Sequence, residues 1–151
     1  MNPAPESTFT VLIIDDDLDL LPFLADAVRL LSDYNVVTAE NGILGLEQFF
    51  ETLPHCVVVD VKMPEIDGYQ FVRALRGDPR TADTPIIMLT ALGHEKDRFS
   101  GLASGADKYL QKPADPVDLV AAIREVIQVS EADRKDRMKH LAESSQPELP
   151  E

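Results

Sequence analysis

The residues that could do chemistry in this chain stand at the ends of four short apolar runs. At these ends the sequence places Asp15 and Asp16, then Asp60, Thr90 and Lys112. Carboxylates suit a hard divalent cation, Mg²⁺ or alternatively Mn²⁺, and a hydroxyl and an ammonium can bind phosphoryl oxygens. A carboxylate beside a cation and a lysine can also attack phosphorus and form an acyl phosphate. We therefore expect Asp15 and Asp16 to bind metal, and Asp60, which stands alone, to be the nucleophile.

Each of these residues also has an ordinary explanation when it is taken singly. Aspartate is favoured in turns and as a helix N-cap, and we expect Asp17 to cap the helix that follows it. Thr90 could simply end a strand, and Lys112 could be a surface lysine. The ordinary explanation is weak for the whole set, because no structural need places carboxylates, a hydroxyl and an ammonium at these ends together.

The spacing of the runs predicts the elements that position them. Short β-branched runs that alternate with helical patterns are typical of buried parallel strands. We expect five strands, at about residues 9–14, 34–39, 56–61, 85–89 and 107–111. We expect helices at about residues 18–31, 42–50, 69–76 and 94–104, and from residue 116 onward. This alternation predicts an α/β fold with a parallel sheet, whose strand ends bring the polar residues to one edge.

Composition narrows the classes of function. The 151 residues correspond to one domain, and 44% hydrophobic residues suffice for a core. The formal net charge of −13 argues against direct binding of nucleic acid or of an anionic membrane, because phosphate attraction needs Lys and Arg patches. The single cysteine, Cys56, is interpreted as a core residue. Without a signal peptide or a long apolar span in the sequence, we expect a cytoplasmic location.

The two ends of the chain differ from its centre. Residues 1–8 are expected to form a disordered lead-in, and residues 9–128 the folded domain. The last helix continues past its core face into a charged stretch, so residues 129–151 are interpreted as a helical extension with a disordered tail or linker. A solvated extension is favoured over a short coiled coil, because Met138 and Leu141 do not establish a heptad repeat.

Five motifs in the chain, between about Thr8 and Gln128, resemble those of the receiver domain of bacterial two-component response regulators. The motifs are Ile14-Asp15-Asp16-Asp17, Val59-Asp60-Val61-Lys62-Met63-Pro64 with Asp67-Gly68, Leu89-Thr90-Ala91, Gly105-Ala106-Asp107 and Lys112-Pro113. The resemblance implies a flavodoxin-like, doubly wound (βα)5 sandwich with strand order 2-1-3-4-5, carrying here an extended C-terminal helix. It also implies a signalling domain and not an enzyme, one that catalyses only its own phosphorylation and slow dephosphorylation.

The resemblance assigns the acidic residues to two tasks. Asp60 would accept a phosphoryl group from a sensor histidine kinase or a phosphotransfer protein. Asp16 would bind Mg²⁺ directly and Asp15 mainly through water. Asp60 itself and the backbone carbonyl of Lys62 would complete the protein ligands of the metal.

The resemblance also assigns residues to phosphoryl binding and to switching. Thr90, the amide of Ala91 and Lys112 would bind the phosphoryl group. When Thr90 moves toward the new charge, Tyr109 would fill the vacated space and change the face of the fourth helix, fifth strand and fifth helix for a downstream protein or output domain. Leu92, beside the acceptor, would shield the phosphoryl group from water.

One departure from the family concerns self-association. In winged-helix DNA-binding regulators the dimer face carries complementary charges, and Arg98 with Asp118 could form one such pair. Lys108 and Ala122, however, stand where that class has an acidic and a basic residue. That dimer mode is therefore disfavoured, although a phosphorylation-dependent dimer stays an alternative. The chain is either a single-domain regulator or the receiver part of a longer protein.

Two other classes of protein fit the sequence less well. A phosphatase-like hydrolase with an aspartate nucleophile usually has a second aspartate two residues later, where this chain has Lys62. A pure interaction module would be expected to lack Asp60, Thr90 or Lys112, and all three are present. The histidines are interpreted as surface residues with no part in phosphotransfer; they are His55, His94 and His140.

Overall fold

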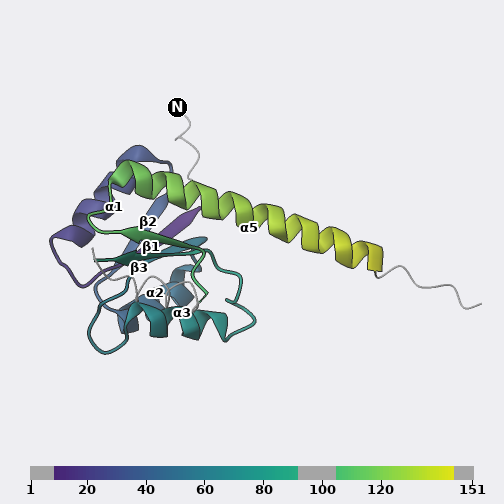
Figure 1. The fold of residues 1–151 in the computed structure, drawn as a ribbon, viewed down its shortest axis with the longest axis horizontal. Helices are drawn as coiled ribbons and strands as arrows, with labels where there is room; N and C mark the ends of the chain where they lie inside the picture. Colours follow the sequence, from purple (N-terminus) through teal and green to yellow (C-terminus); the bar gives the residue numbers. More distant parts are fainter. Residues whose placement is uncertain (1–8, 92–104, 145–151) are drawn as a thin grey trace, which may run out of the picture.

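A five-stranded parallel sheet forms the centre of the protein (Figure 1), in a computed structural model that describes residues 9–91 and 105–144. The strands are β1 (Thr10–Ile14), β2 (Asn35–Ala39), β3 (Cys56–Asp60), β4 (Ile86–Thr90) and β5 (Lys108–Gln111). Their order in the sheet is β2-β1-β3-β4-β5, and every neighbouring pair is parallel. The predicted flavodoxin-like order 2-1-3-4-5 is therefore confirmed.

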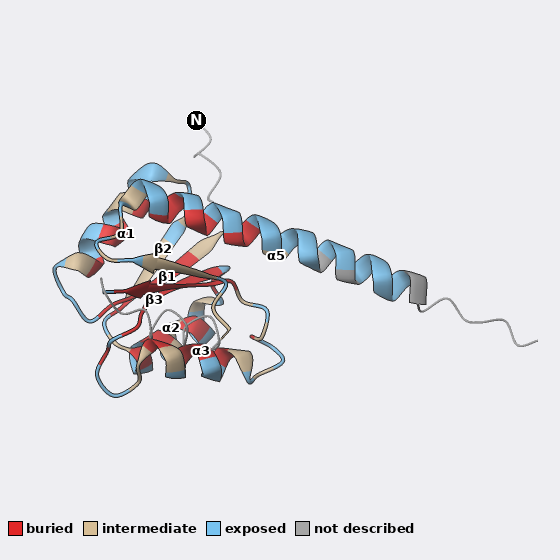
Figure 2. Cartoon of the chain, in the orientation of Figure 1, coloured by how far each residue is buried: buried red, intermediate tan, exposed pale blue. Residues whose placement is uncertain are grey.

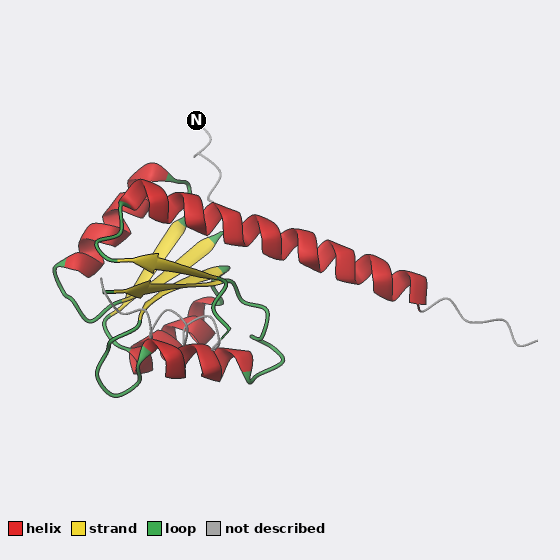
Figure 3. Cartoon of the chain, viewed as in Figure 1, coloured by secondary structure: helices red, strands yellow, loops and turns green. Residues whose placement is uncertain are grey.

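Helices cover both faces of the sheet (Figure 3). They are α1 (Leu20–Leu31), α2 (Gly42–Thr52), α3 (Gly68–Arg76) and α5 (Pro116–Ser144). Helices α1 and α5 pack on one face, and α2 and α3 pack on the other. The predicted fourth helix lies outside the described residues, as do Leu92, His94 and Arg98.

Side-chain alternation along the strands divides the core into two halves, one on each face of the central strands that Figure 2 colours as buried. In β1, Val11 and Ile13 join the half under α1 and α5, whereas Leu12 and Ile14 join the half under α2 and α3. Strands β3 and β4 are buried along their whole length, while the edge strands β2 and β5 are only partly buried. Because β1, β3 and β4 lie in the centre, the polar residues that end them are held by the best-packed part of the domain.

The start of α1 is capped by Asp17, as predicted. The carboxylate of Asp17 accepts hydrogen bonds from the backbone N–H groups of Asp19 and Leu20, at 3.0 and 3.1 Å, and its carbonyl accepts the N–H of Leu21 at 2.9 Å. Asp19, the residue directly before Leu20, makes no side-chain cap bond. Pro22 follows in the first turn and has no N–H to donate.

At the amino edge of the sheet, Arg76 joins three segments. Its guanidinium donates hydrogen bonds of 2.7 to 2.9 Å to the carbonyls of Ala82, Thr84 and Gly105, and it pairs with the Asp107 carboxylate at 2.9 Å. The same Asp107 oxygen accepts the N–H of Ile86 at 2.8 Å. These bonds fasten the end of α3 to the starts of β4 and β5, at the opposite edge from the predicted site.

Helix α5 extends well beyond the sheet (Figure 1). Its first part packs into the core through Leu119, Ile123 and Ile127. Beyond this part most of the described side chains are exposed, including those of Met138 and Leu141. His55 and His140 are exposed as well. Within residues 9–91 and 105–144, no helix has both the length and the apolar character that crossing a membrane requires.

Candidate functional site

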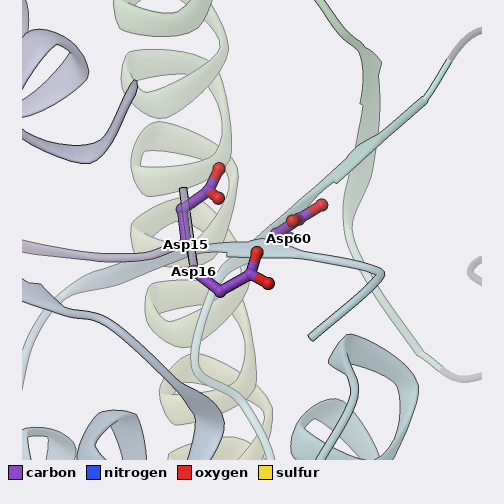
Figure 4. Close-up of side chains that lie close together, drawn as sticks. All are labelled: Asp15, Asp16 and Asp60. Atoms are coloured by element: carbon purple, nitrogen blue, oxygen red, sulfur yellow. The ribbon is translucent and has the colours of Figure 1, made fainter. Parts of the chain in front are cut away.

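Three carboxylates meet at the carboxyl edge of the sheet (Figure 4). Asp15 and Asp16 follow β1 and Asp60 ends β3, and one oxygen of each lies within 4.8 Å of the others. Asp15 and Asp60 are buried, whereas Asp16 is exposed. The neighbouring, parallel β1 and β3 end at the same level, which is why residues 45 positions apart in sequence converge here.

Lys112 reaches back over two of these carboxylates. Its Nζ lies 3.0 Å from Asp15 Oδ2 and 3.1 Å from Asp60 Oδ2. The backbone N–H of Lys112 donates to the carbonyl of Thr90, so the end of β5 stays beside the end of β4, and the peptide bond to Pro113 is cis. Burial by itself would lower the pKa of Lys112, but the carboxylates of Asp15 and Asp60 outweigh burial and raise it.

The charges of the cluster are not balanced. Burial, and next the charge of Asp15, raise the pKa of Asp60 to about 6, although Lys112 opposes the rise. One oxygen of Asp15, Oδ1, accepts the backbone N–H of Asp17 at 2.9 Å. The other, Oδ2, is buried and lies 3.0 Å from Lys112 Nζ, so one ammonium is shared between two carboxylates. Two buried carboxylates that share one lysine, with Asp16 beside them, favour a further bound cation.

The two predicted switch residues lie on neighbouring strands beside the cluster. Thr90 is buried at the end of β4, with its hydroxyl 3.4 Å from the carbonyl of the exposed Ala91. Tyr109 on β5 stands opposite Met88 and packs against the core half under α2 and α3. Its hydroxyl is buried and has no hydrogen-bond partner within the described part of the chain.

A shallow groove adjoins the carboxylates. It has a volume of about 490 Å³ and is lined by Asp16, Val61, Lys62, Met63, Asp67 and Tyr69. The side chain of Lys62 is exposed, and Val61 alone separates Lys62 from Asp60 in the chain. The groove therefore adjoins Asp16, the exposed member of the carboxylate cluster.

The sequence interpretation missed the capping box that starts α3 shortly after Asp60. Asp67 caps α3 by accepting the N–H of Gln70 at 2.8 Å, and the Gln70 side chain accepts the N–H of Asp67 in return. A capping box of this kind has a readable signature, an N-cap residue followed three positions later by Glu or Gln. This signature would have placed the start of the helix at Gly68, whereas the spacing of apolar residues alone suggested a start at Tyr69.

Comparison with known proteins fits this geometry. The family model for the response regulator receiver domain matches residues 11–124. The chain belongs to that family. Among solved structures, a receiver domain protein of Clostridium thermocellum gives a TM-score of 0.76 at 28% identity, covering 82% of this chain and 98% of that one. The chemotaxis protein CheY4 of Vibrio cholerae gives 0.73 at 29% identity, covering 80% and 99%.

The curated relatives of this receiver domain are longer proteins. The DNA-binding dual master transcriptional regulator RpaA of Synechocystis is 37% identical over 90% of this chain and 54% of its own length. The probable transcriptional regulator ycf27 of Guillardia theta is 42% identical over 81% of this chain and 46% of its own. The chain is therefore the receiver domain of a two-component response regulator, and it spans about half the length of these relatives.

Proposed function

We propose that this receiver domain accepts a phosphoryl group on Asp60 in a Mg²⁺-dependent reaction and passes the signal to a partner or output domain. The observation that carries the proposal is the position of Lys112, whose ammonium lies 3.1 Å from the Asp60 carboxylate. A cation at this position neutralises charge that builds on phosphoryl oxygens during transfer. The family of the chain adds the expected donor, a sensor histidine kinase or a phosphotransfer protein.

The residues present fit a hard divalent cation. Asp15, Asp16 and Asp60 offer carboxylate oxygens within 4.8 Å of one another, and the single ammonium of Lys112 is shared between Asp15 and Asp60. Oxygen donors of this kind suit Mg²⁺, which usually takes one or two carboxylates together with a phosphate, and Mn²⁺ would be the alternative. Asp16, Asp60 and the carbonyl of Lys62 would hold the ion, with Asp15 acting through water. The ion would supply positive charge for the phosphoryl oxygens.

The chain's own residues position the reaction. An ionised Asp60 oxygen attacks the phosphorus, and the bond from phosphorus to the donor's nitrogen or acyl oxygen breaks as the new P–O bond forms. Because the pKa of Asp60 is about 6, its carboxylate is mostly ionised at neutral pH. Thr90, the amide of Ala91 and Lys112 would bind the phosphoryl oxygens. This is chemistry on the domain itself, so we do not class the domain as a conventional enzyme.

The switch follows from the new charge on Asp60. Thr90 would move toward the phosphoryl group, and the Tyr109 ring, already packed against the core, would settle into the space that Thr90 leaves. The face that includes β5 and α5 would then change its affinity for a partner. The relatives are about twice as long as the region that this chain matches. The partner we propose is therefore an output domain or a separate downstream protein of the same cytoplasmic pathway.

The intact mass of the protein after incubation with Mg²⁺ and acetyl phosphate tests the proposal. We expect one added phosphoryl group that is lost in alkali, and no addition in Asp60→Asn, whose side chain has the same shape without the nucleophilic oxygen. Chelation of the metal before the donor is added should also abolish labelling. A wild-type protein that stays unlabelled while it is folded would overturn the proposal.

A further inference from the structure

The backbone that follows Asp60 is held between two elements. Past the end of β3, the N–H of Val61 donates to the carbonyl of Leu89 in β4 at 2.9 Å. The carbonyl of Val61 accepts the N–H of Gly68, the first residue of α3, at 2.8 Å. The peptide after the acceptor is thus bonded to β4 on one side and to α3 on the other.

Helix α3 approaches this peptide more closely than a side chain would allow. A Cβ atom on Gly68 would lie 2.5 Å from the carbonyl oxygen of Asp60 and 2.9 Å from both Val61 Cα and the Met88 methyl group. Real Cβ atoms do not show contacts this short. Two of the three contacted atoms are backbone atoms next to the acceptor, so the Asp60 peptide or α3 would have to move.

Helix α3 has little freedom to retreat. Phe71, Val72 and Leu75 on its inner face are almost fully buried against the sheet. Its first turn is fixed by the reciprocal hydrogen bonds between Asp67 and Gln70. Because buried side chains are packed at the density of a crystal, a shift of the whole helix would open a cavity. Strain introduced at Gly68 is therefore expected to reach the Asp60 peptide.

We infer that Gly68 is a positioning residue for the acceptor: its missing side chain lets α3 seat against the Asp60 peptide and so fixes the Asp60 carboxylate relative to Asp15 and Lys112. This inference rests on the proposed function of Asp60. Misplacing a reacting group by about 1 Å can slow a reaction by about 100-fold. Gly68→Ala should accordingly slow phosphoryl transfer in protein that is still folded.

Gly45 in α2 offers a matched control. A Cβ atom there would also meet an atom at 2.5 Å, but that atom is the terminal Cδ1 of the Ile14 side chain, and the next neighbours, Ile14 Cγ1 at 3.1 Å and Phe71 Cε2 at 3.3 Å, are side-chain atoms too. Both glycines are buried helical positions that face the same half of the core. The two alanine variants therefore impose the same nominal overlap, on the Asp60 backbone in one case and on side-chain atoms alone in the other.

The experiment follows the mass of the full chain over time with Mg²⁺ and acetyl phosphate, for wild type, Gly68→Ala and Gly45→Ala. Circular dichroism gives the folded fraction of each protein at the assay temperature. Unfolded molecules in rapid equilibrium with folded ones lower the observed rate constant only in proportion to the folded fraction, so a rate constant divided by that fraction reports the position of the acceptor. We expect the rate constant of Gly68→Ala to fall by about 10- to 100-fold, and that of Gly45→Ala to stay within about twofold.

A second variant separates the backbone contact from the contact with Met88. Met88→Leu removes the methyl group near Gly68 while nearly conserving side-chain volume. In Gly68→Ala/Met88→Leu we expect recovered folding but a rate constant that remains low. Restored transfer in this double variant, or equal rates in Gly68→Ala and Gly45→Ala, would overturn the inference about Gly68 while leaving Asp60 as acceptor. An unlabelled wild type would instead refute the proposed function itself.

Discussion

The two edges of the sheet both bring a basic side chain to aspartate, but they balance charge differently. At the amino edge, Arg76 pairs with the single carboxylate of Asp107 and also donates hydrogen bonds to three backbone carbonyls. At the carboxyl edge, Lys112 serves two carboxylates directly, and Asp16 stands beside them. The first arrangement is complete as it stands, whereas the second carries excess negative charge that only a further cation would neutralise.

The difference separates a structural ion pair from a functional one. A half-buried arginine that donates to three carbonyls and one carboxylate holds segments in place. A buried cluster with more acids than bases lowers the stability of the metal-free domain in exchange for affinity toward a cation and a phosphoryl group. The two edges should therefore respond in opposite directions when a charge is removed.

The largest expected effect is at the amino edge. Arg76→Ala leaves three carbonyls and the Asp107 carboxylate without their donor, and we expect it to lower the free energy of unfolding by about 2 to 4 kcal/mol. Arg80→Ala is the control, because the exposed Arg80 pairs with the nearby Asp78 and lies 5.7 Å from the centre of the Phe50 ring, without joining distant segments of backbone. It should cost less than about 1 kcal/mol in the same urea titration. Equal losses in the two variants would remove the structural role assigned to Arg76.

At the carboxyl edge, removing a charge is expected to raise the free energy of unfolding and not to lower it. Since the folded pKa of Asp60, about 6, exceeds its ordinary value of 3.8, the folded state holds the Asp60 proton more tightly than the unfolded state does. Stability of the metal-free protein should therefore fall as pH rises from about 4 to 6, and then level off.

Asp60→Asn should lack this component and be more stable at pH 7, by on the order of 1 kcal/mol after allowance for solvent screening. The matched variant Asp107→Asn should instead be less stable, since it weakens the pair with Arg76. Thermal unfolding of the three proteins across this pH range measures both signs. A less stable Asp60→Asn would break the contrast between the two edges.

The smallest expected effect is the gain in stability when Mg²⁺ binds. A free Mg²⁺ concentration equal to Kd should add about 0.4 kcal/mol to the free energy of unfolding, because the ion binds only the folded state. We expect Asp16→Ala to lose this increment and Arg76→Ala to keep it, since Arg76 lies at the opposite edge. Thermal shift titrations with Mg²⁺ give the increments, and an undiminished gain in Asp16→Ala would refute its role as a ligand.

The strand-end residues could be predicted from the sequence because each signal is local. A run of β-branched residues, its polar terminator and the rule that parallel strands end at one edge together placed Asp15, Asp60 and Thr90. Lys112 followed from the same rule and does lie on the carboxylates. The chemical roles of these residues, unlike their positions, remain predictions that the experiments above address.

Contacts that depend on distant backbone could not be predicted in the same way. Arg76 meets Gly105 and Asp107 some 30 residues away, and its partners are mostly carbonyls, which have no sequence signature. Gly68 appeared only as part of the Asp67-Gly68 motif, because its closeness to the Asp60 carbonyl depends on how α3 packs.

The exposed part of α5 also acts as a lever arm. At a rise of about 1.5 Å per residue, the stretch from Ile127 to Ser144 reaches about 25 Å beyond the last buried turn. A tilt of only about 5° where α5 leaves the sheet would then displace its far end by about 2 Å. Sub-ångström changes beside β5 would thus become larger displacements at the far end of α5. The helix itself would not need to change its conformation.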